Sequence, residues 1–428
     1  MDPHPEFARN TGRFIAFRVL FSARFYYPVF AILFLDYGLS LEQFALLNAL
    51  WAAAIVLLEV PSGALADRWG RKRMVQLAGL LMVAEMAVLL VVPLGNAWIV
   101  FAAFAVNRVL SGAAEACASG ADEALAYDSL KAAGREAEWP AVLRRLMRWQ
   151  SAAFTLAMLA GAAVYDPGLW NRLWEWAGWE GGWTKAQTLR LPVWMTLGTA
   201  LAACAVAARM AEPPGAAAST APVREVWGQI LEAGRWILGQ PLVLAVLAVA
   251  LLHDSFIRLI LTLQSEYLRA IGYPEASLGL ISAGLAGLGL VVAPLAAVMD
   301  RRPGLAWKLG LAAVAATAGL AGMALSGSLA GLAWVPVLHL VFGLVAYILS
   351  QTLNARVDSA HRATVLSFKG LAFNIAYGVL GLAYGAGARL LPEDAPFTAS
   401  LHWLPWAFAA LMAATALWAG LRSRGRFS

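Results

Sequence analysis

The feature that most constrains this chain is a series of long apolar runs with few charges inside them. The runs at residues 30–35, 44–58 and 74–94 have the apolar character of membrane-crossing helices, and about 20 such residues span the ~30 Å hydrocarbon layer of a bilayer. Of all residues, 61% are hydrophobic and 14% are charged, which is far from the balance of a water-soluble domain. Backbone polar groups in lipid must bond within their own segment, and no alternating strand pattern is present. The sequence therefore predicts an all-α membrane protein.

Charged residues, glycines and prolines divide the apolar runs into twelve expected spans. Their limits are 13–36, 41–63, 74–94, 97–122, 140–165, 190–210, 240–266, 275–298, 306–327, 330–353, 362–390 and 402–421. We expect two pseudo-symmetric six-helix bundles, at residues 1–210 and 241–428, joined by a cytoplasmic linker at 211–240.

The linker has the pattern of a helix that lies on a membrane surface. It opens with Pro, Ala and Ser, and its second part places one set of residues on one helical face: Val223, Val226, Trp227, Ile230, Leu231, Gly234, Ile237 and Leu238. Charged residues such as Arg224 and Glu232 fall elsewhere on the helical wheel. We expect this amphipathic segment to lie at the cytoplasmic surface between the two bundles.

Lysine and arginine are distributed unevenly over the connections between spans. If the N-terminus is cytoplasmic, the same side holds the cation clusters at 68–73, 131–148, 301–308, 356–362 and 422–426. The opposite side holds fewer cations, namely Arg172, Lys185, Arg190, Arg269 and Arg389. Because cytoplasmic loops are enriched in cations, both termini are expected to be cytoplasmic, in a bacterial inner membrane. The net charge of +6 does not indicate a nucleic-acid partner, since the cations form no stripe.

The two halves of the chain can be aligned at a shift of 233 residues. Glu42 lies 25 residues before Asp67, and Glu275 lies 25 residues before Asp300. An arginine follows each of the two aspartates. Membrane helices of similar length always align to some degree, but acid–arginine pairs at matched spacing indicate an internal repeat.

The sequence GALADRWGRKR at 63–73 resembles the signature loop of the major facilitator superfamily, G-x-L-a-D-R-x-G-R-[KR]. The matching residues are Gly63, Leu65, Ala66, Asp67, Arg68, Gly70, Arg71 and Lys72. A degraded copy, MDRRPG, stands at 299–304, and NRVLSGAAEA at 107–116 is similar to the R-x-x-x-G-x-x-A pattern of the family's fourth helix. The resemblance covers essentially the whole chain and implies a twelve-helix secondary transporter.

The resemblance also implies a cytoplasmic gate at this loop. Gly63 would let the second helix approach a neighbour closely, and Gly70 would permit the tight reversal before the third. Asp67 would accept hydrogen bonds from a facing helix N-terminus near 362–364, and Arg71 would pair with an acid after the fourth span. The predicted gating residues are Gly63, Asp67, Arg68, Gly70, Arg71, Asp122 and Asp128. The plainer interpretation is that the cations only orient the helices.

Ionisable side chains near the middle of a span are costly in lipid and mark candidate functional sites. This chain has nine: Arg18, Arg24, Glu85, Arg108, Glu115, His253, Asp254, Arg258 and His339. Most fall on the first, fourth, seventh and tenth spans, which line the central cavity in families that this chain resembles. Arg108 and Glu115 would share a helix face about 10 Å apart, and Asp254 and Arg258 are close enough to pair.

Two sets of site residues follow from this pattern. The expected substrate-binding residues are Arg24, Tyr27, Arg108, Arg258, Tyr347, Asn374 and Tyr377, because arginines bind carboxylate, phosphate or sulfonate groups. The expected proton-coupling residues are Glu115, Asp254 and His253. Structural alternatives stay open: Arg18 as a side chain that snorkels to the interface, Glu85 as the counter-ion of an arginine, and Asp254–Arg258 as an internal pair.

The sequence carries no Walker loop, paired-histidine zinc motif or Cys pair, so no cofactor or metal is expected. We expect a non-enzymatic secondary transporter that moves a small organic, anionic or amphipathic solute by alternating access, coupled to protons. Its expected partners are that solute, the proton and membrane lipid, and it is expected to be a monomer. Export is slightly favoured, although the fifth-helix motif of drug–proton antiporters, G-x-x-x-G-P-x-x-G-G, is reduced here to Gly161. The alternatives are import of a metabolite or metal chelate, an intramembrane enzyme, and a non-transporting sensor.

Overall fold

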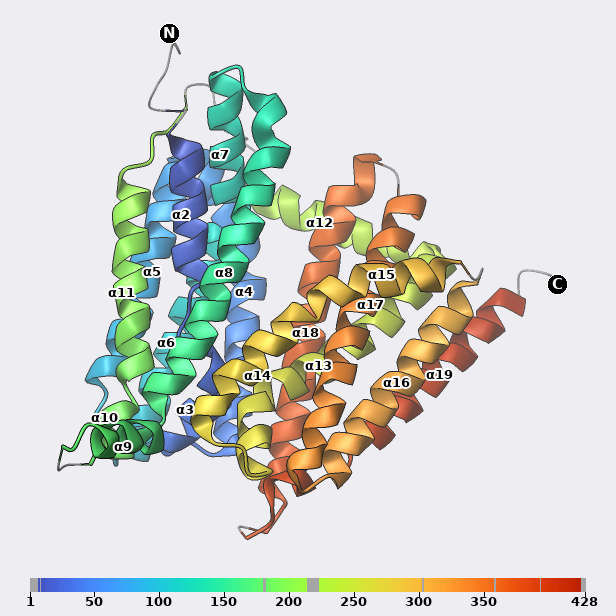
Figure 1. Ribbon diagram of the computed structural model, residues 1–428. Coiled ribbons are helices and arrows are strands. Elements are labelled where there is room, and N and C mark those ends of the chain that lie inside the picture. The colour runs from blue at the N-terminus through green and yellow to red at the C-terminus, as the bar shows by residue number, and fades with distance from the viewer. Residues whose placement is uncertain are drawn as a thin grey trace. The chain divides into compact units, whose positions relative to one another are not determined.

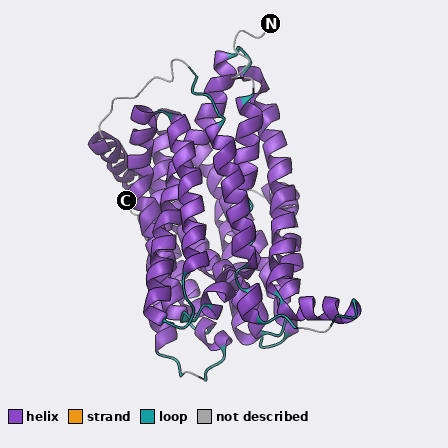
Figure 2. Cartoon of the chain, turned by 90° about the vertical axis from the view of Figure 1, so that its left-hand side faces the viewer, coloured by secondary structure: helices purple, strands orange, loops and turns teal. Residues whose placement is uncertain are grey.

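The computed structural model describes residues 7, 9–179, 182–213, 223–301, 304–357, 359–392 and 394–424. Over these ranges the chain forms helices joined by loops, with no β-strand (Figure 2). Within the described part, eleven helices are long and apolar enough to cross a membrane. The number becomes twelve if the segments Glu136–Tyr165 and Pro167–Trp176, which are bent by 75°, form one broken span. The predicted all-α membrane fold is confirmed.

Contacts divide the chain into two compact units, of which the first comprises residues 1–225 together with 274–283. Its α-helices are α2 (Asn10–Ser22), α3 (Phe30–Asp36), α4 (Leu41–Trp69), α5 (Arg71–Val91), α6 (Ala97–Ala118), α7 (Ala121–Ala132), α8 (Trp139–Tyr165), α9 (Pro167–Trp176), α10 (Lys185–Thr188) and α11 (Leu191–Ala208). In Figure 1, α2, α5, α8 and α11 run side by side, with α7 at one end of the unit and α9 and α10 at the other. Small or flexible side chains such as Ala78, Met82 and Ala114 form the shared core and let the helices pack closely.

The second unit comprises residues 226–273 and 284–428. Its helices, several of which are labelled in Figure 1, are α12 (Val223–Gly239), α13 (Pro241–Ala270), α14 (Glu275–Gly287), α15 (Gly289–Asp300), α16 (Leu305–Leu325), α17 (Trp334–Arg356), α18 (Ser359–Arg389) and α19 (Leu404–Arg424). Helix α13 contacts α17, α18 and α19 and is central to this unit. The start of α14, residues 274–283, belongs by its contacts to the first unit.

The predicted amphipathic helix of the linker is α12. Ile230, Ala233 and Ile237 are buried on its apolar face. Leu231 and Leu238, which the helical wheel also placed near this face, are exposed. The buried face is therefore narrower than the sequence pattern indicated, and the location of α12 at the cytoplasmic surface stays a prediction.

The backbone supports the internal repeat. Pro61 lies inside α4 and Pro294 lies inside α15, and these prolines are 233 positions apart, the shift found in the sequence. Gly70 and Gly304 stand immediately before α5 and α16 with φ of +97° and +116°. Positive φ favours glycine, so each half has a glycine of positive φ after a proline-containing helix, although α4 is continuous and its counterpart is divided into α14 and α15.

The expected close approach at Gly63 is wrong. A Cβ atom at Gly63 would meet no described atom within 4 Å, whereas one at Gly112 of α6 would lie 2.7 Å from the Ala54 Cβ and 3.1 Å from the Trp51 carbonyl oxygen. The close approach of α4 to a glycine is therefore at Gly112 of α6, and the α4 residues that make it lie more than two helical turns before Gly63. The tight reversal expected at Gly70 is confirmed by its φ of +97°.

Candidate functional site

A buried ion cluster occupies the interior of the N-terminal unit. Arg24 is 1% exposed, and its guanidinium forms an ion pair with the carboxylate of Glu85 on α5, which is fully buried. The guanidinium also lies 3.3 Å from the carboxylate of Glu115 on α6 and donates to the Tyr26 hydroxyl at 3.1 Å. Two helices and the break in the first span therefore bring one cation and two acids together.

A break in the first span places Arg24 in this position. Helix α2 ends at Ser22, and the chain resumes at residues 27–29 as a 3₁₀ turn with Pro28 near its start. In the gap, the Phe25 amide donates to the Thr196 hydroxyl of α11 at 3.0 Å. The side chain of residue 24 thus leaves from a non-helical backbone that α11 holds in place, which is the kind of helix interruption that proline permits.

Arg108 lies beside this cluster but has a different environment. Its guanidinium donates twice to the Asn107 side-chain oxygen, at 3.0 and 2.7 Å, and lies 5.4 and 5.2 Å from the ring centres of Phe30 and Phe34. Asn107 in turn donates to the backbone oxygen of Glu85 at 2.8 Å. Within the described ranges, no carboxylate lies within ion-pair distance of Arg108. It is instead stabilised by aromatic faces and a side-chain amide.

The candidate residues of this unit differ in how far solvent reaches them. Arg24 and Arg108 are both buried, so neither guanidinium is open to a solute in this conformation. The Glu115 side chain is 37% exposed, and Tyr27, whose ring packs edge-on against Tyr26, is also exposed. The Glu115 carboxylate and the Tyr27 phenol are therefore the solvent-accessible groups of the site.

The C-terminal unit contains a cavity of about 200 Å³. It is lined by Ala250, His253, Asp254, Arg258, Phe342, Val345, Ala346, Leu349, Lys369, Gly370, Phe373 and Asn374. Arg258 pairs with Asp254 at 2.6 Å, donates to the Asn374 side-chain oxygen at 3.0 Å and lies 5.2 Å from the ring centre of Tyr377. Five predicted site residues therefore lie at or beside one cavity: His253, Asp254 and Arg258 on α13, and Asn374 and Tyr377 on α18.

Two predicted residues have local partners. The Nδ1 atom of His253 lies 2.8 Å from the Val249 carbonyl oxygen, and its ring packs edge-on against Phe408. Tyr347 is not part of the cavity lining, and its hydroxyl donates to the Asp300 carboxylate at 2.9 Å. The position of Tyr347 gives no support to a contact with solute in this cavity.

Sequence reasoning missed Lys369. This residue lines the cavity from α18, with its ammonium 5.6 Å from the ring centre of Phe373. It lies seven residues inside the expected span at 362–390, but it is not among the intramembrane charges named from the sequence. Counting every ionisable residue within a span, irrespective of depth, would have found it.

The family of this chain follows from its similarity to known proteins. The model of the Major Facilitator Superfamily matches residues 14–381. The chain belongs to the Major Facilitator Superfamily. Within that superfamily it is a multi-pass membrane protein of the secondary-transporter kind, and membership indicates a transporter rather than an enzyme.

Solved structures show the same fold at low sequence identity. The nucleoside transporter NupG is similar with a TM-score of 0.74 and 12% identity, over 96% of this chain and 98% of that one. A bacterial homologue of the human lysosomal transporter Spinster gives 0.69 and 16%, over 98% and 97%. The D-xylose–proton symporter gives 0.64 and 13%, over 96% and 95%. A comparison with curated protein sequences found no match.

The superfamily's signature loop has defined partners in this unit. Arg71 forms an ion pair with Asp128 of α7, and the Glu212 carboxylate accepts from the backbone amides of Arg71 and Lys72 at 3.0 and 2.7 Å. Glu212, which the sequence did not suggest, thus caps the N-terminus of α5. Asp122 lies 3.2 Å from Arg18, so Arg18 is paired rather than only snorkelling.

The gating roles of these residues stay predictions. The side chain of residue 362, near the partner expected for Asp67, lies outside the described residues. The Arg71–Asp128 pair is compatible with a gate and with simple fixation of α7 on α5. Whether Gly63, Asp67, Arg68 and Gly70 take part in gating is likewise untested.

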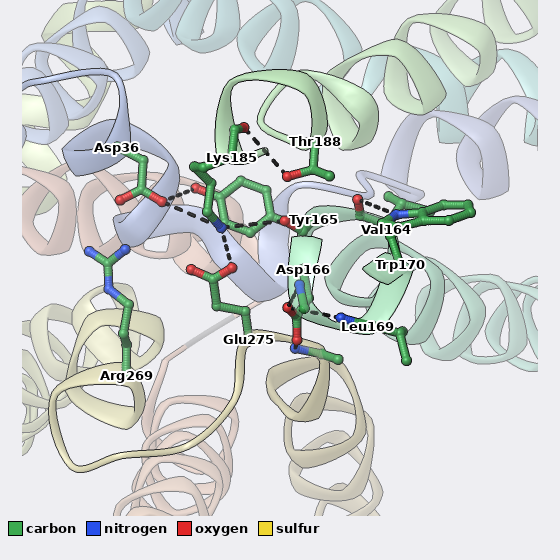
Figure 3. Close-up of polar contacts among 12 residues, drawn as sticks. Asp36, Val164, Tyr165, Asp166, Leu169, Trp170, Lys185, Thr188, Arg269 and Glu275 are labelled. Carbon is green, nitrogen blue, oxygen red and sulfur yellow. Dashed lines mark hydrogen bonds and ion pairs between the residues drawn. The ribbon is translucent and has the colours of Figure 1, made fainter. Parts of the chain in front are cut away.

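At the opposite end of the same unit, polar contacts attach the start of α14 to α8, α9 and α10 (Figure 3). Glu275 pairs with Lys185, whose ammonium lies 3.9 Å from the ring centre of Tyr165 and 3.8 Å from the Asp36 carboxylate. The Tyr165 hydroxyl donates to Asp36 at 2.6 Å. Asp166 accepts from the Gly168 amide of α9 at 2.7 Å and from the Ala276 amide of α14 at 3.1 Å. One carboxylate therefore caps two helices.

Removing the Asp166 cap should lower the free energy of unfolding more than removing a cap that serves a single helix. We expect Asp166→Ala to lower the free energy of unfolding by about 2 kcal/mol, because two helix N-termini lose their acceptor. The matched control is Asn96→Ala, since Asn96 caps α6 alone among the described helices, with an expected loss of about 1 kcal/mol. Denaturant unfolding of both variants in detergent measures the difference. Equal losses would show that the contact with Ala276 contributes nothing.

Proposed function

We propose that this protein is a proton-coupled secondary active transporter of a small organic solute that carries an anionic group. The observation that carries the proposal is the ion cluster of the N-terminal unit, where Arg24 is 1% exposed while its partner Glu115 is 37% exposed. Glu115 is thus a carboxylate on a membrane-spanning helix that solvent protons can reach. A group of this kind, held by a buried arginine, is suited to take up and release a proton.

Charge balance connects the proton to an anion. Arg24 and Arg108 bring two positive charges to this interior, and Glu85 and Glu115 bring two negative charges when they are ionised. Protonation of Glu115 leaves one surplus positive charge, which is unfavourable in a medium of low dielectric constant. An anionic solute in the protein interior offsets that charge without having to touch Arg24 or Arg108, which are buried. Proton uptake and anion binding therefore favour each other.

The sign of this coupling supports one direction of transport. A proton and a solute that favour each other's binding move together, which under an inward proton gradient gives import. Export by proton antiport, which the family resemblance suggested, requires the two to compete, and the fifth helix here lacks the Gly-Pro pair of drug–proton antiporters. Import of an organic anion is therefore the direction that the charges favour, with export as the alternative.

The test is flux through the purified protein in vesicles that contain a pH-sensitive dye. We expect an aromatic or aliphatic sulfonate to cause proton movement that protein-free vesicles do not show; sulfonates are chosen because they do not cross lipid as neutral acids. Glu115→Gln should reduce solute-driven proton movement at least about tenfold, and Glu123→Gln should leave it within about twofold, since Glu123 lies at 49% exposure outside the cluster. Solute movement without protons in the unsubstituted protein contradicts coupling. Product formation in detergent without flux would favour an enzyme.

A further inference from the structure

The cavity of the C-terminal unit carries an unbalanced charge. The Arg258 guanidinium is neutralised by Asp254 at 2.6 Å. Lys369 lies in the same lining, and within the described residues no carboxylate is within ion-pair distance of its ammonium group. Its neighbour is the Phe373 ring, 5.6 Å away. Asp254 is the one carboxylate among the described lining residues, and it interacts electrostatically with both cations, so the lining carries one positive charge in excess.

The lining around Lys369 is mostly apolar. Phe342, Val345, Leu349 and Phe373 form walls of the cavity. An ammonium group in such surroundings is costly unless an anion or water compensates it. The lining therefore suits a ligand with one anionic group and an apolar body.

Asn374 offers hydrogen-bond donors beside the lysine. Its side-chain oxygen accepts from Arg258 at 3.0 Å, so the orientation of the amide is set, and its nitrogen presents two donors elsewhere. Lys369, Gly370, Phe373 and Asn374 recur at the spacing of one helical face of α18, and all four line the cavity. A cation, an aromatic ring and an amide thus stand on the same face of α18.

We propose that Lys369 is the anion-binding residue of this cavity and that the solute is an organic monoanion with an apolar, planar body. The anionic group binds the Lys369 ammonium and the Asn374 amide, and the body packs against Phe342 and Phe373. One negative charge is specified because Arg258, Lys369 and Asp254 leave one surplus positive charge. This inference rests on the proposed function and names the chemical class of its solute.

A purely structural role of Lys369 would affect stability but not the binding of anions. A lysine that packs its stem on Phe373 and extends its ammonium toward an interface contributes packing but no ligand selectivity. Lys369→Met keeps the apolar stem and removes the charge, and Lys369→Arg keeps the charge. Lys308→Met is the matched control, because Lys308 pairs with Asp300 and is not part of the cavity lining.

The experiment measures ligand protection against thermal unfolding in detergent. Three probe pairs each compare an anion with its neutral amide: benzoate and benzamide, benzenesulfonate and benzenesulfonamide, indole-3-acetate and indole-3-acetamide. We expect at least one anion to protect the unsubstituted protein more than its amide does. Lys369→Met should weaken the affinity for that anion about tenfold or more, while Lys369→Arg and Lys308→Met should change it by less than about threefold.

Each outcome decides between the proposals. If no anion protects more than its amide, or if Lys369→Met binds as tightly as the unsubstituted protein, the assignment of Lys369 is wrong. If anions bind through Lys369 but none of them moves across vesicles, the anion site stands and the transport proposal falls. If anions are transported and Lys369→Met binds them unchanged, transport stands and the site lies elsewhere.

Discussion

Replacing Glu85 with alanine is expected to lower the free energy of unfolding by about 3–5 kcal/mol, the range found when one partner of a buried ion pair is removed. Glu85 is fully buried and pairs with Arg24, which is 1% exposed. Without Glu85, the guanidinium keeps Glu115, but that carboxylate is 3.3 Å away and partly in solvent. The remaining contact cannot replace the desolvated one, so a buried charge is left largely uncompensated.

The control and a rescue make this expectation testable. Glu123→Ala removes an acid that lies 3.6 Å from Arg18 at the surface, and an exposed pair contributes only about 0–1 kcal/mol. The double variant Arg24→Met/Glu85→Met removes both charges, and we expect it to recover most of the lost stability. Denaturant unfolding in detergent measures all three. A Glu85→Ala variant no less stable than Glu123→Ala would mean that Glu115 alone satisfies Arg24.

The spans could be predicted because lipid imposes a length and a composition on them. Expected limits such as 306–327 differ from the observed α16, Leu305–Leu325, by one or two residues. Helix α13 reaches Ala270, four residues beyond its expected end. The excess is explained by Glu266 and Arg269, which pair at 2.6 Å and so extend the helix past the apolar run. A charged residue predicts the end of a span, but two charged residues that pair with each other can continue the helix.

The partners of the buried charges could not be predicted in the same way. A helix such as α5 is apolar all round, so its sequence does not indicate which face meets which neighbour. The spacing of Arg108 and Glu115 predicted a shared helix face, but the Glu115 side chain contacts Arg24 and the Arg108 side chain contacts Phe30 and Phe34. Rotation of helices about their axes decides such pairings, and it depends on packing between segments far apart in the chain.

The close contacts of the glycines could not be predicted from the sequence either, because they depend on neighbouring segments that are far apart in the chain. The family pattern drew attention to Gly63, where the structure has open space, and treated Gly161 as the remnant of a missing motif. A Cβ atom at Gly161 of α8 would overlap the carbonyl oxygen of Phe25 and lie 2.7 Å from its carbonyl carbon. Which glycine permits a close approach follows from where a neighbouring backbone leaves its helix, and here that place is the break around residue 24.

Gly161→Ala is therefore expected to be strongly disruptive, although alanine is the better helix former by about 1 kcal/mol. The non-helical backbone around Phe25 cannot move away from the added methyl group. On its other side the Phe25 amide is bonded to Thr196 at 3.0 Å, and the Thr199 hydroxyl donates to the Ala23 carbonyl at 3.2 Å. Overpacking against fixed backbone costs about 1–3 kcal/mol or more. Because Arg24 leaves from the same break, displacement of the break also disturbs its pairing with Glu85.

The matched control is Gly198→Ala on α11, where a Cβ atom would meet no described atom within 4 Å. That substitution should leave the melting temperature unchanged or raise it, since only helix propensity changes. Gly161→Ala should lower the melting temperature and reduce solute-driven proton movement in vesicles, because the ion cluster is displaced with the break. If Gly161→Ala melts as high as Gly198→Ala, the backbone around Phe25 is free to move. The geometry that holds Arg24 between its two carboxylates would then not be set by α8.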